Sequence, residues 1–171
     1  MTEGLADTHD NATPGHQRLY ATWARGGAAL LLSGNIMVDR RYLERAGNVV
    51  LEEGSGLAPL RAWAQAARDG GSQLWAQISH PGRQCPRLVN GTPLAPSAVQ
   101  LKLAGNFGRP RAATSDDIQD IIERFARTAA WVKNAGLDGV QVHSAHGYLL
   151  SQFLSPRTNQ RQDRWGGSLD N

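Results

Sequence analysis

Segments with helical periodicity alternate along this chain with short apolar runs, and this alternation constrains the fold more than any other feature. The expected helices, with their flanking signals, cover residues 13–27, about 56–68, and 115–136. The expected strands cover residues 28–34, 72–79 and 138–142. Strands that are separated by helices pair in parallel and pack against those helices. The sequence therefore predicts an α/β protein built on a parallel sheet.

Local signals support these helices. Thr13 and Ser115 precede the first and third helices, and hydroxyl side chains commonly cap a helix by accepting from backbone N–H groups. The third helix has an apolar stripe with a 3.6-residue period, formed by Ile118, Ile121, Ile122, Phe125, Ala129 and Val132. Residues 80–114 show no such period and are expected to form a long loop. A further helix is expected to begin at Ser168.

Polar side chains appear toward the carboxyl ends of two predicted strands. Val140 and Val142 share one face of their strand, while Gln141 and His143 share the other, and Gln77 ends a polar row in residues 72–79. Active sites of parallel α/β barrels lie at this end of the strands, and doubly wound sheets bind ligands there too. A doubly wound sheet normally carries a glycine-rich phosphate loop, but the sequence has neither a G-x-G-x-x-G nor a Walker motif. The pattern favours a barrel.

His143, His146 and Tyr148 lie within six positions directly after the last predicted strand. Histidine pairs bind zinc, which would suggest a zinc-dependent hydrolase, but no H-E-x-x-H frame accompanies them. The three side chains could also simply pack in a core. A third interpretation is a site where two imidazoles stabilise charge on a ligand oxygen and the phenol donates a proton. The position at a strand end favours this site, and a redox reaction there would need a cofactor, because none of these side chains transfers hydride.

Composition narrows the class of protein. The chain has 171 residues, of which 40% are apolar and 19% charged, enough for one globular domain. Its net charge of +3 comes without a run of like charges, so a nucleic-acid partner is not expected. Cys85 is the one cysteine, which excludes an internal disulfide, and no segment resembles a signal peptide or a membrane span. We expect a cytoplasmic protein that acts on a small molecule and has no membrane partner.

The segment HSAHGYLLSQFLSPRTNQRQDRWGGSLDN, residues 143–171, resembles the signature of the Old Yellow Enzyme family, the FMN-dependent NADH:flavin oxidoreductases. QISHPGRQ, residues 77–84, resembles the loop after the third strand in that family, and LLLSGNIMV, residues 30–38, its second-strand region. The similarity covers nearly the whole chain. This chain has two histidines where other members of the family have His and Asn. In this it resembles the bacterial ene-reductases and 2,4-dienoyl-CoA reductases of the family.

The resemblance implies a (β/α)8 TIM barrel that binds FMN across its carboxyl-terminal mouth and uses NAD(P)H as reductant. Hydride would pass to flavin N5 and then to the β-carbon of an activated alkene. His143 and His146 would hold the carbonyl or nitro oxygen of the substrate, or the nicotinamide carboxamide, and Tyr148 would protonate the α-carbon. Cofactor binding is implied for Gln77, for the backbone at Gly34, and for His143 near flavin N1 and O2. No metal is implied.

The same resemblance accounts only for the second to fourth barrel strands, so residues 1–171 are expected to form an incomplete FMN-binding domain without the first strand and the C-terminal half. Leu30, Val140 and Val142 would then be exposed at unpaired sheet edges. The isolated chain is expected to bind FMN weakly at most and to be inactive. The alternative is a catalytically inactive remnant that needs a partner half-barrel. The substrate, the choice between NADH and NADPH, and the oligomeric state of a full-length protein stay open.

Several other polar residues allow more than one interpretation. His80 and Arg83 either brace a loop or contact a ligand, and Ser33 and Asn35 either pack or contact the flavin. Cys85 is expected to be inert, because nothing near it in the sequence would activate it. A structural network is expected of four residues near the C-terminal end: Arg157, Asn159, Arg161 and Asp163.

Overall fold

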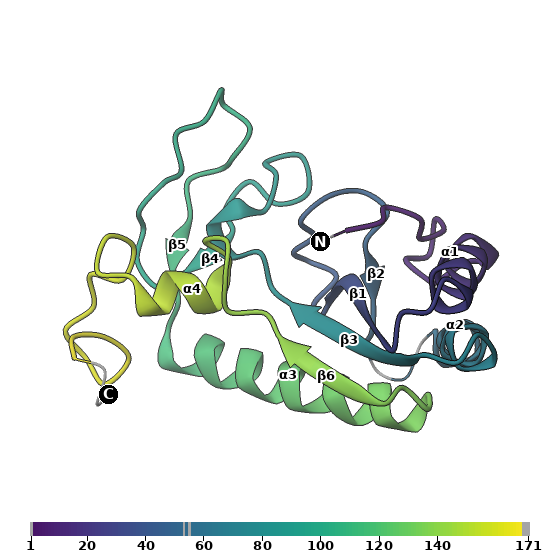
Figure 1. Ribbon diagram of the computed structural model, residues 1–171. Helices are drawn as coiled ribbons and strands as arrows, with labels where there is room; N and C mark the ends of the chain where they lie inside the picture. The colour runs from purple at the N-terminus through teal and green to yellow at the C-terminus, as the bar shows by residue number, and fades with distance from the viewer. Residues whose placement is uncertain (1, 53, 55, 169–171) are drawn as a thin grey trace.

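A parallel four-stranded sheet lies at the centre of the computed structural model, which describes residues 2–52, 54 and 56–168 (Figure 1). Its strands, in the order β2-β1-β3-β6, are β1 (Leu30–Met37), β2 (Val49–Val50), β3 (Gln73–Ser79) and β6 (Gly139–Val142). Three long helices pack against it: α1 (Pro14–Arg25), α2 (Leu57–Asp69) and α3 (Ser115–Asn134). Figure 1 shows α1 and α2 side by side and α3 running along β6. The predicted parallel α/β arrangement is confirmed.

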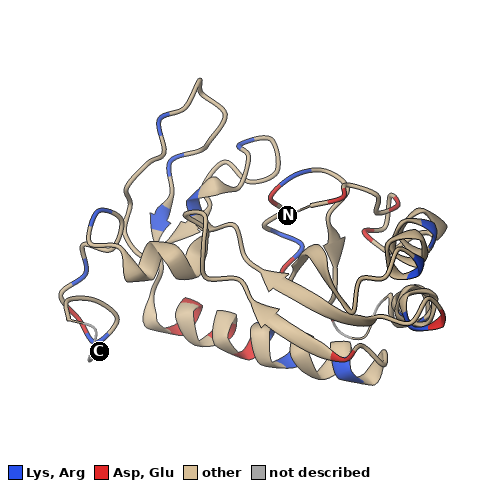
Figure 2. Ribbon diagram, viewed as in Figure 1, with Lys and Arg blue, Asp and Glu red and all other residues tan. Residues whose placement is uncertain are grey.

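The main core lies between the helices and one face of the sheet, which we call the outer face. Leu74, Ala76 and Ile78 of β3 are fully buried there, and so is Trp63 of α2. The Trp63 ring lies 4.5 Å from the ring of His16 and 4.9 Å from that of Tyr20, measured between centroids. In Figure 2 charged residues of both signs lie on the helices and loops, while the ribbons of β3 and β6 carry none. Apolar burial on the outer face therefore holds the helices to the sheet.

The cap of α3 differs from the prediction. Thr114, rather than Ser115, precedes the helix, and its Oγ1 accepts a hydrogen bond from the Asp117 amide at 3.1 Å. The Asp117 carboxylate accepts in return from the Thr114 amide at 2.8 Å. This reciprocal pair is a capping box, for which the acidic residue must lie three positions after the cap. Ser115 instead accepts a hydrogen bond from the Trp165 indole at 3.2 Å.

The strand predicted over residues 28–34 begins later and extends to Met37, because Ser33-Gly34-Asn35 continues the strand instead of ending it. The predicted loop 80–114 contains the 3-10 helix η1 (Gly82–Gln84) and two short strands, β4 (Leu94–Ala95) and β5 (Arg111–Ala112), which pair in parallel. These strands and β2 are each two residues long, too short to show any periodicity.

We call the opposite face of the sheet the inner face. A register shift in β1 determines which of its side chains reach this face. Leu32 pairs with Trp75 and Asn35 with Gln77, so three residues of β1 advance where β3 advances two. Such an irregularity reverses the alternation of side chains beyond it. Asn35 consequently shares the inner face with Gln77, and Ile36 packs in the outer core.

A short helix, α4 (Leu149–Leu154), follows Tyr148, and Leu149 anchors it in a second buried cluster with Ile118 and Ile121. The side chain of Leu154, at the end of this helix, is exposed. The helix expected from Ser168 lies outside the described residues. Of the helices in the described ranges, none has the length and apolarity needed to cross a membrane.

The sheet edge agrees in part with the expected exposure. Leu30 and Val142 are 50% and 49% exposed. Val140, expected to be exposed, is instead half-buried and packs against the outer core, because α3 lies along β6.

Candidate functional site

His143, His146 and Tyr148 come together just beyond the carboxyl end of β6. The His143 amide donates to the Ile78 carbonyl at 3.0 Å, which extends the ladder between β6 and β3 by one residue. The His143 ring centroid lies 5.2 Å from that of His146 and 5.2 Å from that of Tyr148. The structure thus places the three residues that the sequence singled out in one cluster.

The chain reverses direction between His143 and Tyr148 through two residues with left-handed backbones, His146 (φ +58°) and Gly147 (φ +73°). A left-handed backbone costs a residue with a side chain about 1 kcal/mol, so other contacts must hold the turn. Gln84 donates to the His146 carbonyl at 3.2 Å, and the buried Gln152 donates to the Gly147 carbonyl at 2.6 Å. These two glutamines therefore hold the backbone that carries the exposed His146 ring.

The imidazole of His143 is 4% exposed and its Nε2 has no hydrogen-bond partner among the described residues. Burial is the main factor that holds the pKa of His143 below its ordinary value, so the ring is neutral at pH 7. A buried polar atom without a partner carries a desolvation penalty that a ligand oxygen would relieve. His143 is thus suited to bind a ligand atom on the inner face.

The phenol of Tyr148 is half-buried, and burial raises its pKa. The carboxylate of Glu44 raises the pKa further, while a hydrogen bond with Asn35 lowers it in part. The net direction keeps Tyr148 protonated at neutral pH, as a proton donor must be.

Asn35 connects the cluster to the neighbouring strands. Gln77 Nε2 donates to Asn35 Oδ1 at 2.6 Å, and the Asn35 side chain also acts on Tyr148, since it lowers the pKa of that phenol. Ser33 Oγ accepts from the Gln77 amide at 2.8 Å, deep in the sheet. Of the two residues with undecided roles, Ser33 is thus a sheet contact, and Asn35 belongs to the site.

Gly34 has a local reason for being glycine. Its amide donates to Glu3 Oε1 at 2.7 Å, and a Cβ built on Gly34 would clash with the Glu3 carboxylate and come within 2.9 Å of Thr2 Cα. Glu3 also accepts from the buried Tyr20 hydroxyl. The close approach of residues 2 and 3 explains Gly34, and its predicted role toward flavin stays a prediction.

His80 and Arg83 both brace the loop after β3. His80 Nδ1 accepts from the Gly82 amide at 3.0 Å, its ring packs 4.6 Å from that of Tyr42, and burial lowers its pKa to about 4. Arg83 Nη1 donates to the Val99 carbonyl at 3.1 Å. Cys85 is buried, which raises its pKa to about 11 and disfavours the reactive thiolate, in line with the expectation of an inert cysteine.

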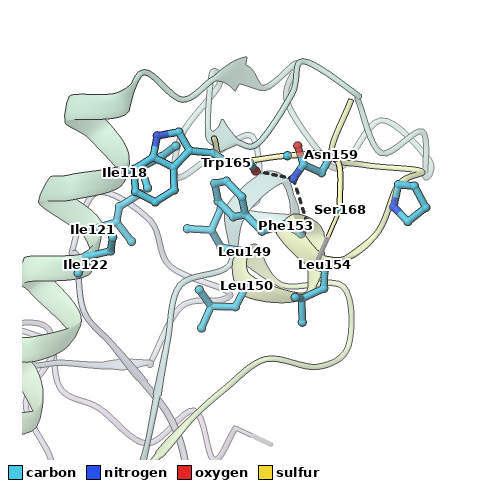
Figure 3. Close-up of a pocket in the computed structure, with 13 residues that line it drawn as sticks. Ile118, Ile121, Ile122, Leu149, Leu150, Phe153, Leu154, Asn159, Trp165 and Ser168 are labelled. Carbon is cyan, nitrogen blue, oxygen red and sulfur yellow. Dashed lines mark hydrogen bonds between the residues drawn. The ribbon is translucent and has the colours of Figure 1, made fainter. Parts of the chain in front are cut away.

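The network predicted near the C-terminal end is confirmed for three of its four members. Arg161 donates to the Pro96 and Ala113 carbonyls at 3.0 and 2.6 Å and pairs with Asp163. Asn159 Nδ2 donates to the carbonyls of Phe153 and Trp165, as the dashed lines in Figure 3 mark. Arg157 was wrongly included: it is exposed, and no hydrogen bond or ion pair involves it within the described ranges.

Two pockets lie near Tyr148 and α4. One, of 660 Å³, is lined by Glu44, Gln84, Tyr148 and residues 86–88 and 105–107. The second, of 480 Å³ and shown in Figure 3, lies between α3 and α4 and is mostly apolar. None of its described lining residues titrates, whereas the first pocket includes the phenol of Tyr148 and the carboxylate of Glu44. No three His, Cys, Asp or Glu side chains in the described part of the chain are grouped to hold a metal ion.

Comparison with known proteins gives consistent matches over the whole chain. The sequence model of the NADH:flavin oxidoreductase / NADH oxidase family matches residues 1–171. The chain is 43% identical over 160 residues to the NADH-dependent flavin oxidoreductase nadA of Aspergillus parasiticus, an alignment that covers 89% of this chain and 36% of that protein. It is 38% identical over 173 residues to the NADH oxidase of Thermoanaerobacter brockii, covering 99% of this chain and 26% of that protein.

Solved structures agree. The Old Yellow Enzyme homologue from Zymomonas mobilis superposes with a TM-score of 0.90 at 30% identity, covering 100% of this chain and 50% of that one. Morphinone reductase gives 0.88 at 27% identity, with 100% and 49% covered, and another of its structures contains tetrahydroNAD. The chain thus spans about half the length of these solved relatives, and its sheet and helices are part of a TIM barrel. FMN as cofactor and a nicotinamide as reductant follow from these matches, and the chain belongs to the NADH:flavin oxidoreductase / NADH oxidase family.

Proposed function

We propose that residues 1–171 supply the substrate-binding and proton-donating groups of an FMN-dependent NAD(P)H oxidoreductase that reduces activated C=C bonds. One observation carries this proposal. The buried Nε2 of His143 has no partner among the described residues, and it belongs to a ring 5.2 Å from His146 and from a protonated phenol. A hydrogen-bond donor pair beside an acid, at the carboxyl end of a barrel strand, suits an α,β-unsaturated carbonyl compound.

The residues present fit a flavin. The buried amide of Gln77 lies on the inner face, where it offers a hydrogen bond to a polar ring edge. We assign Gln77 to FMN. We also assign His143 to FMN, but as a ring contact only, because its unpartnered Nε2 is assigned to the substrate oxygen. Gly34 would contribute its backbone only after the Glu3 carboxylate had moved. Bound FMN would supply the hydride transfer between NAD(P)H and the alkene, which side chains cannot supply.

Within this function the side chains have separate roles. His143 and His146 donate hydrogen bonds to the substrate oxygen, which withdraws electron density from the conjugated double bond. Tyr148 gives its proton to the α-carbon and regains one from water. Enones, dienoyl thioesters and related compounds all present such an oxygen, so they form the expected substrate class.

The test uses a chimera in which residues 1–171 replace the matching part of the Aspergillus parasiticus relative. Tyr148→Phe should lower the rate of alkene reduction by about 100-fold, the low end for a general acid, and leave flavin reduction by NADH unchanged. His143→Ala and His146→Ala should lower both rates. Tyr42→Phe, which removes the hydroxyl of a buried tyrosine outside the cluster, serves as the control. Unchanged alkene reduction in Tyr148→Phe would overturn the proposal.

A second candidate is a catalytically inactive remnant that needs a partner half-barrel, favoured by the exposed Leu30 and Val142. Residues 1–171 alone are expected to be colourless, and stoichiometric flavin that co-purifies with them would contradict this expectation. A flavin band that appears only on mixing with a complementary half-barrel would support the partner. Cytoplasmic location and the absence of nucleic-acid and membrane partners remain predictions.

A further inference from the structure

The pocket of 660 Å³ beside Tyr148 has a wall that the catalytic cluster does not include. Pro86 and Phe107 form an antiparallel bridge, and the Arg87 amide donates to the Asn106 carbonyl at 2.9 Å. These contacts hold two parts of the loop 80–114 together as one wall of the pocket. The apolar side chains of Leu88 and Phe107 line this wall. A ligand that reaches Tyr148 through this pocket would pack its carbon skeleton against that wall.

Glu44 and Tyr148 line the same pocket as this wall. The carboxylate of Glu44 makes several contacts. Its Oε2 accepts hydrogen bonds from Thr2 Oγ1 at 2.6 Å and from Asn48 Nδ2 at 3.4 Å. Asn48 Oδ1 accepts from the amides of Glu44 and Arg45, both at 2.9 Å, which fixes the backbone as well. The carboxylate is therefore held in place. Within the described residues no Lys, Arg or His forms an ion pair with it; Arg87 lines the same pocket but is not paired with Glu44.

We propose that Glu44 sets the charge selectivity of the pocket at Tyr148. Its fixed carboxylate admits neutral and cationic activated alkenes and disfavours those that carry a carboxylate. This inference rests on the proposed function, because it concerns the substrate of the same site. Two like charges within about 7 Å in a partly buried pocket repel enough to lower affinity roughly tenfold. The carboxylate of Glu44 also raises the pKa of Tyr148, as expected for two groups that line one pocket.

Cinnamamide and cinnamate test the inference, because they share a carbon skeleton and differ by one negative charge. Binding is followed through the ¹³C resonance of the Tyr148 ring in the 171-residue chain, assigned with Tyr148→Phe, so that neither FMN nor turnover is needed. Glu44→Gln removes the charge and keeps an acceptor for Thr2 and Asn48. Glu44→Asp keeps the charge, and Glu123→Gln removes an exposed carboxylate on α3 as the matched control.

The wild type, Glu44→Asp and Glu123→Gln should bind cinnamamide about tenfold more tightly than cinnamate, and Glu44→Gln should bind both alike. Equal binding of both probes by the wild type, or an unchanged preference in Glu44→Gln, would overturn the inference and leave the proposed function standing. If neither probe perturbs Tyr148 in any variant, the pocket is not a substrate site, and the inference falls together with that part of the proposed function.

Discussion

The two faces of the central strands differ in the burial and the polarity of their side chains. On the outer face of β3, Leu74, Ala76 and Ile78 are all completely buried under the helices. On the inner face, Trp75 is 36% exposed while its neighbour Gln77 is buried in a polar network. The outer face is uniform along its length, whereas the inner face changes from exposed side chains to buried polar ones toward the carboxyl end.

This difference separates stability from chemistry. The outer face gains free energy from apolar area removed from water and needs no particular polar group. The inner face buries amides and an imidazole, which cost free energy unless each finds a partner. We therefore expect substitutions on the outer face to affect unfolding most, and those on the inner face to act on hydrogen bonding and ligand binding.

The largest effect is expected at the centre of the outer core. Trp63→Ala removes a fully buried indole that packs on His16 and Tyr20, and should lower the free energy of unfolding by about 3–5 kcal/mol. Trp23→Ala is the matched control, because Trp23 also contacts Tyr20 but is 45% exposed. Urea denaturation measures both. Equal losses in the two variants would mean that burial does not distinguish the outer face.

The next effect concerns pH and the loop after β3. The pKa of His80 falls from 6.5 to about 4 because burial disfavours the charged ring. A lowered pKa in the folded state stabilises the protein above pH 6.5, and this contribution is lost as pH falls toward 4, by about 3 kcal/mol in all. His80→Asn keeps an acceptor for the Gly82 amide, so it should flatten the loss between pH 6.5 and 4. Identical slopes of unfolding free energy against pH in both proteins would contradict this.

A third experiment examines the inner face directly. Asn35→Ala leaves the buried Gln77 Nε2 without its acceptor and should cost about 2 kcal/mol in urea unfolding. Adding Gln77→Ala should then cost less than it does in the wild type, because the lost bond is already absent. Additive effects would show that the two amides do not form a coupled pair. Asn35→Ala should also raise the pKa of Tyr148, since the hydrogen bond that lowers it is removed.

Much of the outer face could be predicted from the sequence, because an element that is buried on one side has apolar residues at regular intervals. The stripe of α3 and the alternation of β3 are of this kind. The cluster of His143, His146 and Tyr148 was found from its residue types and its place after a strand. Its geometry agrees with that reading, although the assigned roles are still proposals.

The remaining parts of the site left no such signal. Asn35 reaches the inner face only because of the register shift in β1, and a sequence read with strict alternation cannot show an extra residue. Glu44 lies in an irregular loop, and Gln152 is a polar residue in a helix of six residues. Their roles depend on contacts with segments distant in sequence, such as Gln152 with the loop after β3. These residues could be identified only in three dimensions.

The smallest effect on stability is expected at Leu30, where the two faces can be compared in adjacent residues. Leu30 is 50% exposed on the inner face and Leu31 is 7% exposed on the outer face. Leu30→Gln should change the free energy of unfolding by no more than about 0.5 kcal/mol and reduce self-association, because it removes exposed apolar area beside an open barrel face. Leu31→Gln should cost about 3 kcal/mol, since it buries an amide in the outer core. Urea denaturation and sedimentation velocity measure the two effects. If both variants lost the same stability, the inner face at Leu30 would have to be packed in solution, and the contrast between the faces would be confined to the polar end of the strands.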